Sequence, residues 1–303
     1  MEDFLAISEC STDELTGLLE ESRSLKALYK AGQRDLCLAG KTLAMLFEKP
    51  SLRTRISFQV AMTDLGGSPI YVKPEDIGGI GKREPVKDIA RVLGRYVHGI
   101  MARTFEHRTV IDLAKYADIP VINALTDWSH PCQAMADVLT IVEHFDRIEG
   151  ITIAYIGDGN NVARSLAFAA GKLGMKLIVA SPPGYELDPT SIETANQFAP
   201  GCVAQLDDPR AAVAEADVIY TDTWVSMGQE EEKDKRRQEF AGFEVNSALV
   251  AAAPKHVKIM HCLPAYRGFE ISDEVTESPN SIVFDQAENR LHFQRALLRK
   301  LMV

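Results

Sequence analysis

Short apolar runs alternate along this chain with stretches of helical periodicity, and this alternation constrains the fold more than any other feature. The runs are TLAMLF, PIYV, HGIMA, PVINAL, ITIAYIG, KLIVAS, DVIYTD, VKIMHCL and SIVF. A short apolar run followed by a helical pattern is typical of a strand that is buried on both faces and then crosses over to a parallel neighbour. The sequence therefore predicts an α/β fold with parallel sheets covered by helices.

The length of the chain predicts two domains. A single hydrophobic core stops growing at roughly 250–300 residues, and this chain has 303. A helical stretch at 131–145 separates the first four runs from the others, which follow Gly150. We expect two doubly wound domains joined by interdomain helices: residues 1–145, with a C-terminal helix at 286–303 that packs back on them, and residues 146–285.

A first helix is predicted close to the N-terminus. Ser11 and Glu14 have the spacing of a capping box, in which each residue satisfies a backbone N–H of the other. The leucines that follow recur at helical spacing and predict one apolar stripe, made of Leu15, Leu18, Leu19, Leu25 and Leu28.

The composition excludes several classes of protein. A formal net charge of -10 repels nucleic acid and anionic membranes, so we expect neither as a partner. No apolar run approaches the roughly 20 residues that span a bilayer, and the acidic start MEDFLAISECSTDEL is unlike a targeting peptide. The five cysteines lack CxxC spacing, which predicts reduced thiols and no structural zinc site. We expect a cytoplasmic protein.

Polar residues follow many of the apolar runs. Ligands of open parallel sheets bind beyond the carboxyl ends of the strands, so these residues are candidates for a functional site. They are Lys49, Ser51, Arg53, Thr54, Arg103, Thr104, Asp127, His130, Gln133, Asp158, Asn160, Asn161, Asp222, Ser226, His261 and Cys262.

The stretch FEKPSLRTR concentrates positive charge where a strand ends and a helix begins. Pro50 suits a helix start, and the residues from Ser51 to Thr54 would offer free backbone amides and two hydroxyls to an anion. Arg53 and Arg55 are roughly 200° apart on a helix, so one faces the anion and the other pairs with a carboxylate such as Glu48. We predict a phosphate site; the alternative is a solvated basic helix start.

In the stretch DWSHPCQ, His130 and Gln133 lie three residues apart at a helix start marked by Pro131, so both can face one ligand. Neutral His and Gln side chains donate hydrogen bonds without adding charge, which suits a carbonyl or carboxamide. The alternative is a helix cap beside a satisfied core histidine.

The stretch AYIGDGNNVARS resembles a dinucleotide fingerprint only in part. The third glycine of that fingerprint would fall at Val162, and the next run ends at Ser181 where an acidic residue is expected. A turn that frees Asn160 or Asn161 for a polar ligand remains open, and so does a plain strand-to-helix turn.

Two later stretches carry further candidates. Asp222 ends a run and is suited to bind an amine; the mixed-charge segment after Gly228 is either a solvated face or a loop that moves with Ser226 and Met227. In MHCLPAYRG, Cys262 is a candidate nucleophile, a soft polar contact or a small buried residue.

Taken in order, FEKPSLRTR, DWSHPCQ, DTWVSMGQE, HCLPAYRG and AENRLH make the chain resemble the ornithine carbamoyltransferases, from about Leu36 to the C-terminus. The resemblance implies a carbamoyl phosphate domain and an ornithine domain, a homotrimer with active sites between subunits, and a place in arginine biosynthesis. It implies the substrates carbamoyl phosphate and L-ornithine, with no metal, no cofactor and no covalent intermediate.

The resemblance also implies roles for individual residues. For catalysis it implies Arg103, His130, Asp222 and Cys262. For carbamoyl phosphate binding it implies Ser51, Leu52, Arg53, Thr54, Arg103, His130, Gln133, Cys262, Leu263 and Arg290. For ornithine binding it implies Asn161, Asp222, Ser226 and Met227.

The sequence departs from the family pattern at two places. Leu52 stands where many members carry threonine, and a glutamine that some members contribute to a neighbouring subunit's site is replaced by glycine near Gly79, with Lys82 as a candidate substitute.

Three rival functions are considered. A carbamoyltransferase for another acceptor, such as putrescine, an acylated ornithine or aspartate, is the nearest alternative; an aspartate acceptor would need extra cations, whereas here an acid, Asp222, follows the strand. A catalytically idle binding protein conflicts with retention of the polar residues, and an NAD-dependent oxidoreductase conflicts with the incomplete fingerprint.

Overall fold

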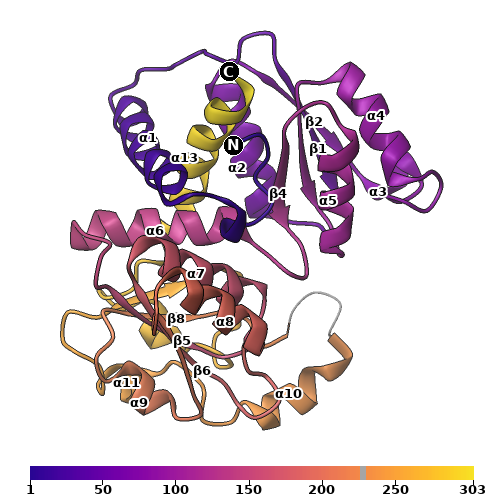
Figure 1. The fold of residues 1–303 in the computed structure, drawn as a ribbon. Helices are drawn as coiled ribbons and strands as arrows, with labels where there is room; N and C mark the ends of the chain where they lie inside the picture. The colour runs from indigo at the N-terminus through magenta and orange to yellow at the C-terminus, as the bar shows by residue number, and fades with distance from the viewer. Residues whose placement is uncertain (226–229) are drawn as a thin grey trace. The chain divides into compact units, whose positions relative to one another are not determined.

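A computed structural model describes residues 1–225 and 230–303. The chain divides into two compact units: unit 1 comprises residues 1–139 and 288–303, and unit 2 comprises residues 140–287 (Figure 1). Every pair of named strands in both sheets is parallel, which confirms the predicted α/β fold class. The unit boundaries fall inside helices α6 (Pro131–Phe145) and α13 (Val283–Met302), so these two helices connect the units along the chain.

Unit 1 contains a four-stranded sheet with the order β2-β1-β3-β4. Its strands are β1 (Thr42–Phe47), β2 (Ser68–Val72), β3 (Gly99–Arg103) and β4 (Val121–Leu125). The chain adds β2 on one side of β1 and β3 on the other, so right-handed crossovers place helices on both faces. The helical segments are η1 (Ile7–Glu9), α1 (Thr12–Lys30), α2 (Leu52–Asp64), α3 (Pro74–Ile77), α4 (Val86–Tyr96) and α5 (His107–Tyr116).

Unit 2 contains a five-stranded sheet with the order β7-β6-β5-β8-β9. Its strands are β5 (Thr152–Ile156), β6 (Lys176–Ala180), β7 (Val203–Leu206), β8 (Val218–Thr221) and β9 (Lys258–His261). The order reverses between β5 and β8, as in doubly wound sheets. The helical segments are α7 (Asn161–Leu173), α8 (Pro189–Phe198), α9 (Pro209–Val213), η2 (Glu230–Glu232), α10 (Lys233–Glu239), α11 (Ser247–Val250) and α12 (Asp273–Thr276).

The central strands are apolar because both of their faces are covered. All five residues of β3 are buried, and so are all four of β8. In unit 2, Ile156, Ile219 and Ile259 from three adjacent strands pack with Phe240 in one core cluster. This double burial explains why the runs were recognisable as uninterrupted apolar stretches rather than as alternating ones.

Helix α1 begins with the predicted capping box, since Ser11 accepts from the backbone N–H of Glu14 and Glu14 accepts from that of Ser11. Leu15, Leu18, Leu19 and Leu25 are buried as expected, whereas Leu28 is 38% exposed. The predicted apolar stripe is therefore correct for the first four leucines and wrong for the last.

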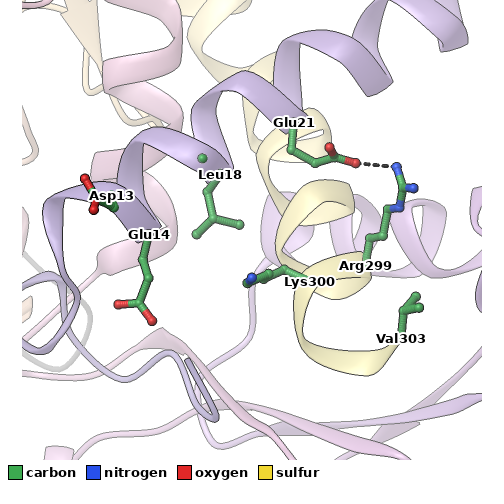
Figure 2. Close-up of a pocket in the computed structure, with 8 residues that line it drawn as sticks. Asp13, Glu14, Leu18, Glu21, Arg299, Lys300 and Val303 are labelled. Atoms are coloured by element: carbon green, nitrogen blue, oxygen red, sulfur yellow. Dashed lines mark hydrogen bonds and ion pairs between the residues drawn. The ribbon is translucent and has the colours of Figure 1, made fainter.

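Helix α13 lies against α1 within unit 1. A hollow of about 490 Å³ separates part of the two helices, lined on the α1 side by Asp13, Glu14, Leu18 and Glu21 and on the α13 side by Arg299, Lys300 and Val303 (Figure 2). Glu21 and Arg299 form an ion pair across it. Glu14 pairs with the N-terminal amine at 2.8 Å.

One strand assignment made from the sequence was wrong, and one strand was missed. The run SIVF is not a strand: Ser281 makes only an isolated bridge to Ile259, and α13 begins at Val283. A run of four residues does not distinguish a strand from the start of a buried helix. Strand β7 was missed because its burial alternates, which gives no continuous apolar run. Within the described residues, no helix combines the length and the apolarity needed to cross a bilayer.

Candidate functional site

Each sheet has one place where the strand order reverses, and open parallel sheets bind ligands there, beyond the carboxyl ends of the strands. In unit 1 this place lies between β1 and β3, and in unit 2 it lies between β5 and β8. The predicted site residues that the structure describes fall into two groups, one in each unit.

In unit 1, the segment after β1 forms the N-terminus of α2. Ser51 is the N-cap residue, with an extended backbone, and its hydroxyl accepts from the backbone N–H of Thr54 at 3.2 Å. The first N–H groups of a helix have no intrahelical partner and carry partial positive charge, which favours an anion. Arg53 adds a full charge in this first turn. The side chain of Leu52, the first residue of α2, is 74% exposed.

Arg103 is the last residue of β3 and is buried. Glu48 fixes its position from the neighbouring strand: the Glu48 N–H donates to the Arg103 carbonyl at 2.8 Å, and the Glu48 carboxylate accepts from the backbone N–H of Phe105 at 2.9 Å. The amine of Lys49 lies 4.4 Å from the centroid of the Phe105 ring. Burial, and then the charge of Arg103, lower the pKa of Lys49. Lys49 is thus a further cation beside Arg103.

A buried hydrogen-bonded chain links three helices of unit 1. Arg290, on α13, donates from Nη1 to Oε1 of Gln133 and from Nη2 to the Thr54 hydroxyl, the latter at 3.2 Å. Gln133, in the first turn of α6, donates from Nε2 to Asp137 at 2.8 Å. Arg290 thereby connects the start of α2 to the start of α6.

His130 stands directly before α6 and is buried. Burial lowers its pKa well below the ordinary value, and the positive charges of Arg290, Arg103 and Arg53 lower it further, in that order. The positive charges of three guanidinium groups therefore disfavour protonation of the His130 imidazole, which stays neutral. This arrangement is suited to bind an anion with the cations and to donate a neutral hydrogen bond from the histidine.

In unit 2, Asp222 and Cys262 follow the adjacent strands β8 and β9 and are in contact. The thiol of Cys262 donates to Oδ1 of Asp222 at 2.8 Å. The backbone N–H of Thr223 donates to the same oxygen at 2.7 Å. Leu263 follows with a positive φ of 57° and donates its N–H to Nδ1 of His261 at 2.8 Å. The two sequence candidates at these strand ends thus form one polar group.

Asn160 and Asn161 have different positions at the start of α7. Asn160 is the N-cap of α7, and its side chain accepts from the backbone N–H groups of Val162 and Ala163. Its amide also donates to Oδ2 of Asp222 at 2.8 Å. Asn161 is the first residue of the helix. The sequence left a ligand role open for either asparagine, and the family resemblance implied Asn161; neither predicted the link from Asn160 to Asp222.

Among the described residues, Asp222, His261 and Cys262 are a candidate metal-ligand group, with ligand atoms within 4.8 Å of one another. Both ring nitrogens of His261 already have partners: Nδ1 accepts from Leu263, and Nε2 lies 3.1 Å from the Glu270 carboxylate. Donation to Glu270 also fixes the ring orientation. The group therefore offers a metal only the carboxylate and the thiol, and both of these bind each other.

The structure brings together Arg53, Arg103, His130, Gln133 and Arg290 in unit 1, with Ser51 and Thr54 at the start of α2, and it brings together Asp222 and Cys262 in unit 2. Ser226 and Met227 lie outside the described residues. One pairing was wrong: Arg55 does not contact Glu48 but donates to Gln59 at 3.3 Å and lies 4.0 Å from the Tyr71 ring centroid. The Glu48 carboxylate instead accepts a hydrogen bond from the backbone N–H of Phe105.

Two family models match the chain. The model described as "Aspartate/ornithine carbamoyltransferase, carbamoyl-P binding domain" matches residues 2–143, and the model described as "Aspartate/ornithine carbamoyltransferase, Asp/Orn binding domain" matches residues 149–301.

Individual proteins are similar over the full length. A protein of Thermococcus kodakarensis named ornithine carbamoyltransferase is 52% identical, with 99% of this chain and 96% of the relative covered. A protein of Pyrococcus furiosus named ornithine carbamoyltransferase, anabolic, is 51% identical, with 99% and 96% covered. A solved structure of ornithine carbamoyltransferase from Pyrococcus furiosus superposes with a TM-score of 0.96 at 51% identity and covers 99% of this chain and 97% of its own.

Proposed function

The chain belongs to the aspartate/ornithine carbamoyltransferase family, and from this premise we propose that it transfers the carbamoyl group of carbamoyl phosphate to the δ-amine of L-ornithine, giving L-citrulline and phosphate. The observation that carries the proposal is the buried hydrogen-bonded group of unit 1, in which Arg290 donates to Gln133 and to the Thr54 hydroxyl at the start of α2. Carbamoyl phosphate is the mixed anhydride of carbamic and phosphoric acids, so cations suit its phosphate and neutral donors suit its carbonyl oxygen.

Unit 1 binds carbamoyl phosphate in this proposal. The phosphate lies at the N-terminus of α2, where Ser51, Leu52, Arg53 and Thr54 supply amides, hydroxyls and one charge. Gln133 and Arg290 contact the same ligand, and their mutual hydrogen bond supports a shared role. Arg290 also reaches the first turn of α2, because it donates to the hydroxyl of Thr54, the residue after Arg53.

Arg103 and His130 polarise the carbamoyl carbonyl. Amine attack turns that carbonyl oxygen into an oxyanion, and donors placed in advance at this position stabilise the transition state more than the ground state. Because its pKa is lowered by burial and by the arginines, His130 donates as a neutral imidazole. Cys262 and Leu263 complete the set of residues assigned to the carbamoyl phosphate.

Unit 2 binds ornithine in this proposal, through Asn161, Asp222, Ser226 and Met227. An acid at the carboxyl end of β8 suits a substrate with two amines. The attacking δ-amine must be neutral, although the free amine has a pKa of about 10.4. The contact between Asp222 and Cys262 supports a role for this pair in orienting the amine and accepting its proton.

The domain assignment follows the same division. We assign residues 1–145 and the helix at 286–303 to carbamoyl phosphate binding, and residues 146–285 to ornithine binding. The descriptions of the two family models support these roles. Near Gly79, the loop with Lys82 stands in place of the glutamine that some members contribute to a neighbouring subunit.

We propose a homotrimer built through unit 1. Three apolar side chains near one edge of its sheet support this assembly: Leu52 is 74%, Ile56 48% and Ile70 49% exposed. Leu52 and Ile56 lie one turn apart on α2, and Ile70 is on the edge strand β2. Contiguous exposed apolar side chains, such as Leu52 and Ile56 on one face of α2, mark interaction surfaces.

We further propose a cytoplasmic protein that acts in arginine biosynthesis. Cys10, Cys37, Cys132, Cys202 and Cys262 are all free thiols, which suits a reducing compartment. The biosynthetic direction is supported by the Pyrococcus furiosus relative, which is named as anabolic.

An acceptor panel tests the function. Purified protein is given carbamoyl phosphate with ornithine, putrescine, acetylornithine or aspartate, and ureido product and phosphate are measured together. We expect the highest rate with ornithine, at least roughly tenfold above that with any other acceptor. A higher rate with another acceptor would contradict the assignment of ornithine, and no phosphate release with any acceptor would contradict the transferase.

A further inference from the structure

We infer that Asn160 is the positioning residue that holds the Asp222 carboxylate in its ornithine-binding orientation, an inference that rests on the proposed function. Asn160 donates from Nδ2 to Oδ2 of Asp222 at 2.8 Å. It does not itself need to contact the substrate. Its effect on ornithine binding passes through Asp222.

The orientation of the Asn160 amide is determined by its neighbours. Its oxygen faces three donors: the backbone N–H of Val162 at 2.8 Å, that of Ala163 at 3.2 Å, and the hydroxyl of Tyr155 at 3.2 Å. The reversed amide would place its NH₂ group against the two N–H groups, which only donate. The NH₂ group must therefore face Asp222.

Tyr155 supports this arrangement from the interior of unit 2. It is fully buried and stacks on Tyr220, with ring centroids 5.5 Å apart. Burial, and then the negative charge of Asp222, raise the pKa of Tyr155 well above its ordinary value, so its hydroxyl stays a donor over the working pH range. The oxygen side of Asn160 is thus fixed by the helix terminus and by a rigid aromatic pair.

All donors to Asp222 in this group are neutral. Oδ1 accepts from the Thr223 N–H and the Cys262 thiol, and Oδ2 accepts from Asn160. Neutral donors fix both oxygens without cancelling the negative charge, which remains available to attract a cationic amine. Loss of the Asn160 donor would free Oδ2 and allow the carboxylate to rotate away from Cys262.

The competing explanation is that Asn160 only caps α7. Replacement of Asn160 by serine separates the two roles, because serine is an equally good N-cap but cannot reach Asp222 with a second group. Asn246 provides a matched control: it caps α11 in the same unit by accepting from the Leu249 N–H at 3.1 Å, and among the described residues no hydrogen bond joins it to Asp222.

We expect Asn160→Ser to raise the KM for ornithine by roughly tenfold or more, the loss of one hydrogen bond to a charged group. The KM for carbamoyl phosphate and the melting temperature should match those of Asn246→Ser. Asn160→Asp also keeps the cap but replaces the donor by a like charge, so its effect on the ornithine KM should be larger. An ornithine KM within about twofold of the control in both variants overturns the inference.

A crystal structure of Asn160→Ser gives a readout that does not depend on activity. We expect the Asp222 carboxylate to leave its 2.8 Å contact with the Cys262 thiol. An unchanged Asp222 rotamer overturns the positioning role even if the kinetics change. If the wild-type protein forms no citrulline, the proposed function fails, while the Asp222 rotamer still decides the positioning role.

Discussion

Arg290 donates a hydrogen bond to Gln133, a residue 157 positions away in the sequence, and the pair is buried in unit 1. The second arm of the guanidinium reaches Thr54. Arg290, Gln133 and Thr54, three of the residues that we propose for carbamoyl phosphate binding, are therefore joined by hydrogen bonds.

Arg290 donates two hydrogen bonds from one planar guanidinium group, so we predict that lysine cannot replace it. Arg290→Lys keeps the charge but loses simultaneous donation to Gln133 and Thr54. We expect the dissociation constant for carbamoyl phosphate to rise by roughly ten- to a hundredfold, corresponding to about 1.5–3 kcal/mol for a charged hydrogen bond. Isothermal titration calorimetry checks this. Arg55→Lys, on the same helix but directed at Tyr71 and Gln59, is the control that should bind normally.

His130 predicts a pH dependence of stability. The pKa of His130 is about 6.5 in the unfolded chain and is lowered well below that value in the folded protein. Over the pH range between these two values, the unfolded state binds a proton at His130 and the folded state does not. Stability from His130 is thus present above pH 6.5 or so and is lost as the pH falls below it, by up to about 1.4 kcal/mol per pH unit. Urea unfolding between about pH 7.5 and 5.5 should show a smaller loss in His130→Gln. Equal slopes for the two proteins would be inconsistent with this role.

Asp222 predicts a selective loss of ornithine binding. Asp222→Asn removes the negative charge opposite the proposed amine while keeping the side-chain shape, so kcat/KM for ornithine should fall at least roughly a hundredfold. Carbamoyl phosphate affinity should not change.

Asp217 is the matched control for that substitution, because it directly precedes β8, at the amino end of the strand that Asp222 follows at its carboxyl end. Its carboxylate accepts from Arg147 and from the Thr152 N–H and lies next to His256. Asp217→Asn should lower stability and leave the ornithine kinetics intact. Similar kinetic losses in the two variants would refute a specific role for Asp222.

Arg236 predicts a large effect on stability. This buried guanidinium pairs with Asp158 at 2.9 Å and donates to the Trp224 carbonyl at 2.9 Å. Burial already raises the pKa of Asp158 despite that partner. Arg236→Met leaves Asp158 buried without a cation, which should cost about 3–5 kcal/mol of unfolding free energy. Denaturant unfolding measures it, and the double variant with Asp158→Asn should recover part of the loss.

The proposed trimer predicts that a charge on the exposed face of α2 separates the subunits. Ile56→Glu should give monomers in sedimentation velocity, because it places a carboxylate in the apolar surface with Leu52 and Ile70. Val92→Glu is the control: Val92 is 45% exposed, but on α4. Unchanged sedimentation of the Ile56 variant would place the interface elsewhere.

The parallel sheets were predictable because strands such as β3 and β8 are buried on both faces, and burial of this kind leaves a continuous apolar run. Strand β7 was not predictable in this way, since it lies at the sheet edge and exposes alternate residues. The run SIVF was wrongly predicted to be a strand, because a buried helix start and a strand have the same short apolar pattern.

The positions of Arg103 and Asp222 at strand ends were predictable, because each directly follows or ends a recognisable apolar run. Partners far apart in sequence were not, and the link between Arg290 and Gln133 depends on the packing of α13. The position of Asn160 had a signal in the sequence: it directly precedes the helix, where an asparagine caps with its oxygen and keeps its NH₂ group for another acceptor. The side chain of Arg55 was misassigned because an aromatic ring, Tyr71, competes with a carboxylate for a guanidinium.

The central claim is that the start of α2 and the arginines around His130 hold carbamoyl phosphate. Equilibrium titration of carbamoyl phosphate into the wild-type protein and into Arg53→Ala, with unfolding curves for both, tests it most directly. The account predicts equal stability and a dissociation constant at least roughly tenfold higher for the variant. Wild-type affinity in a folded Arg53→Ala protein would contradict it.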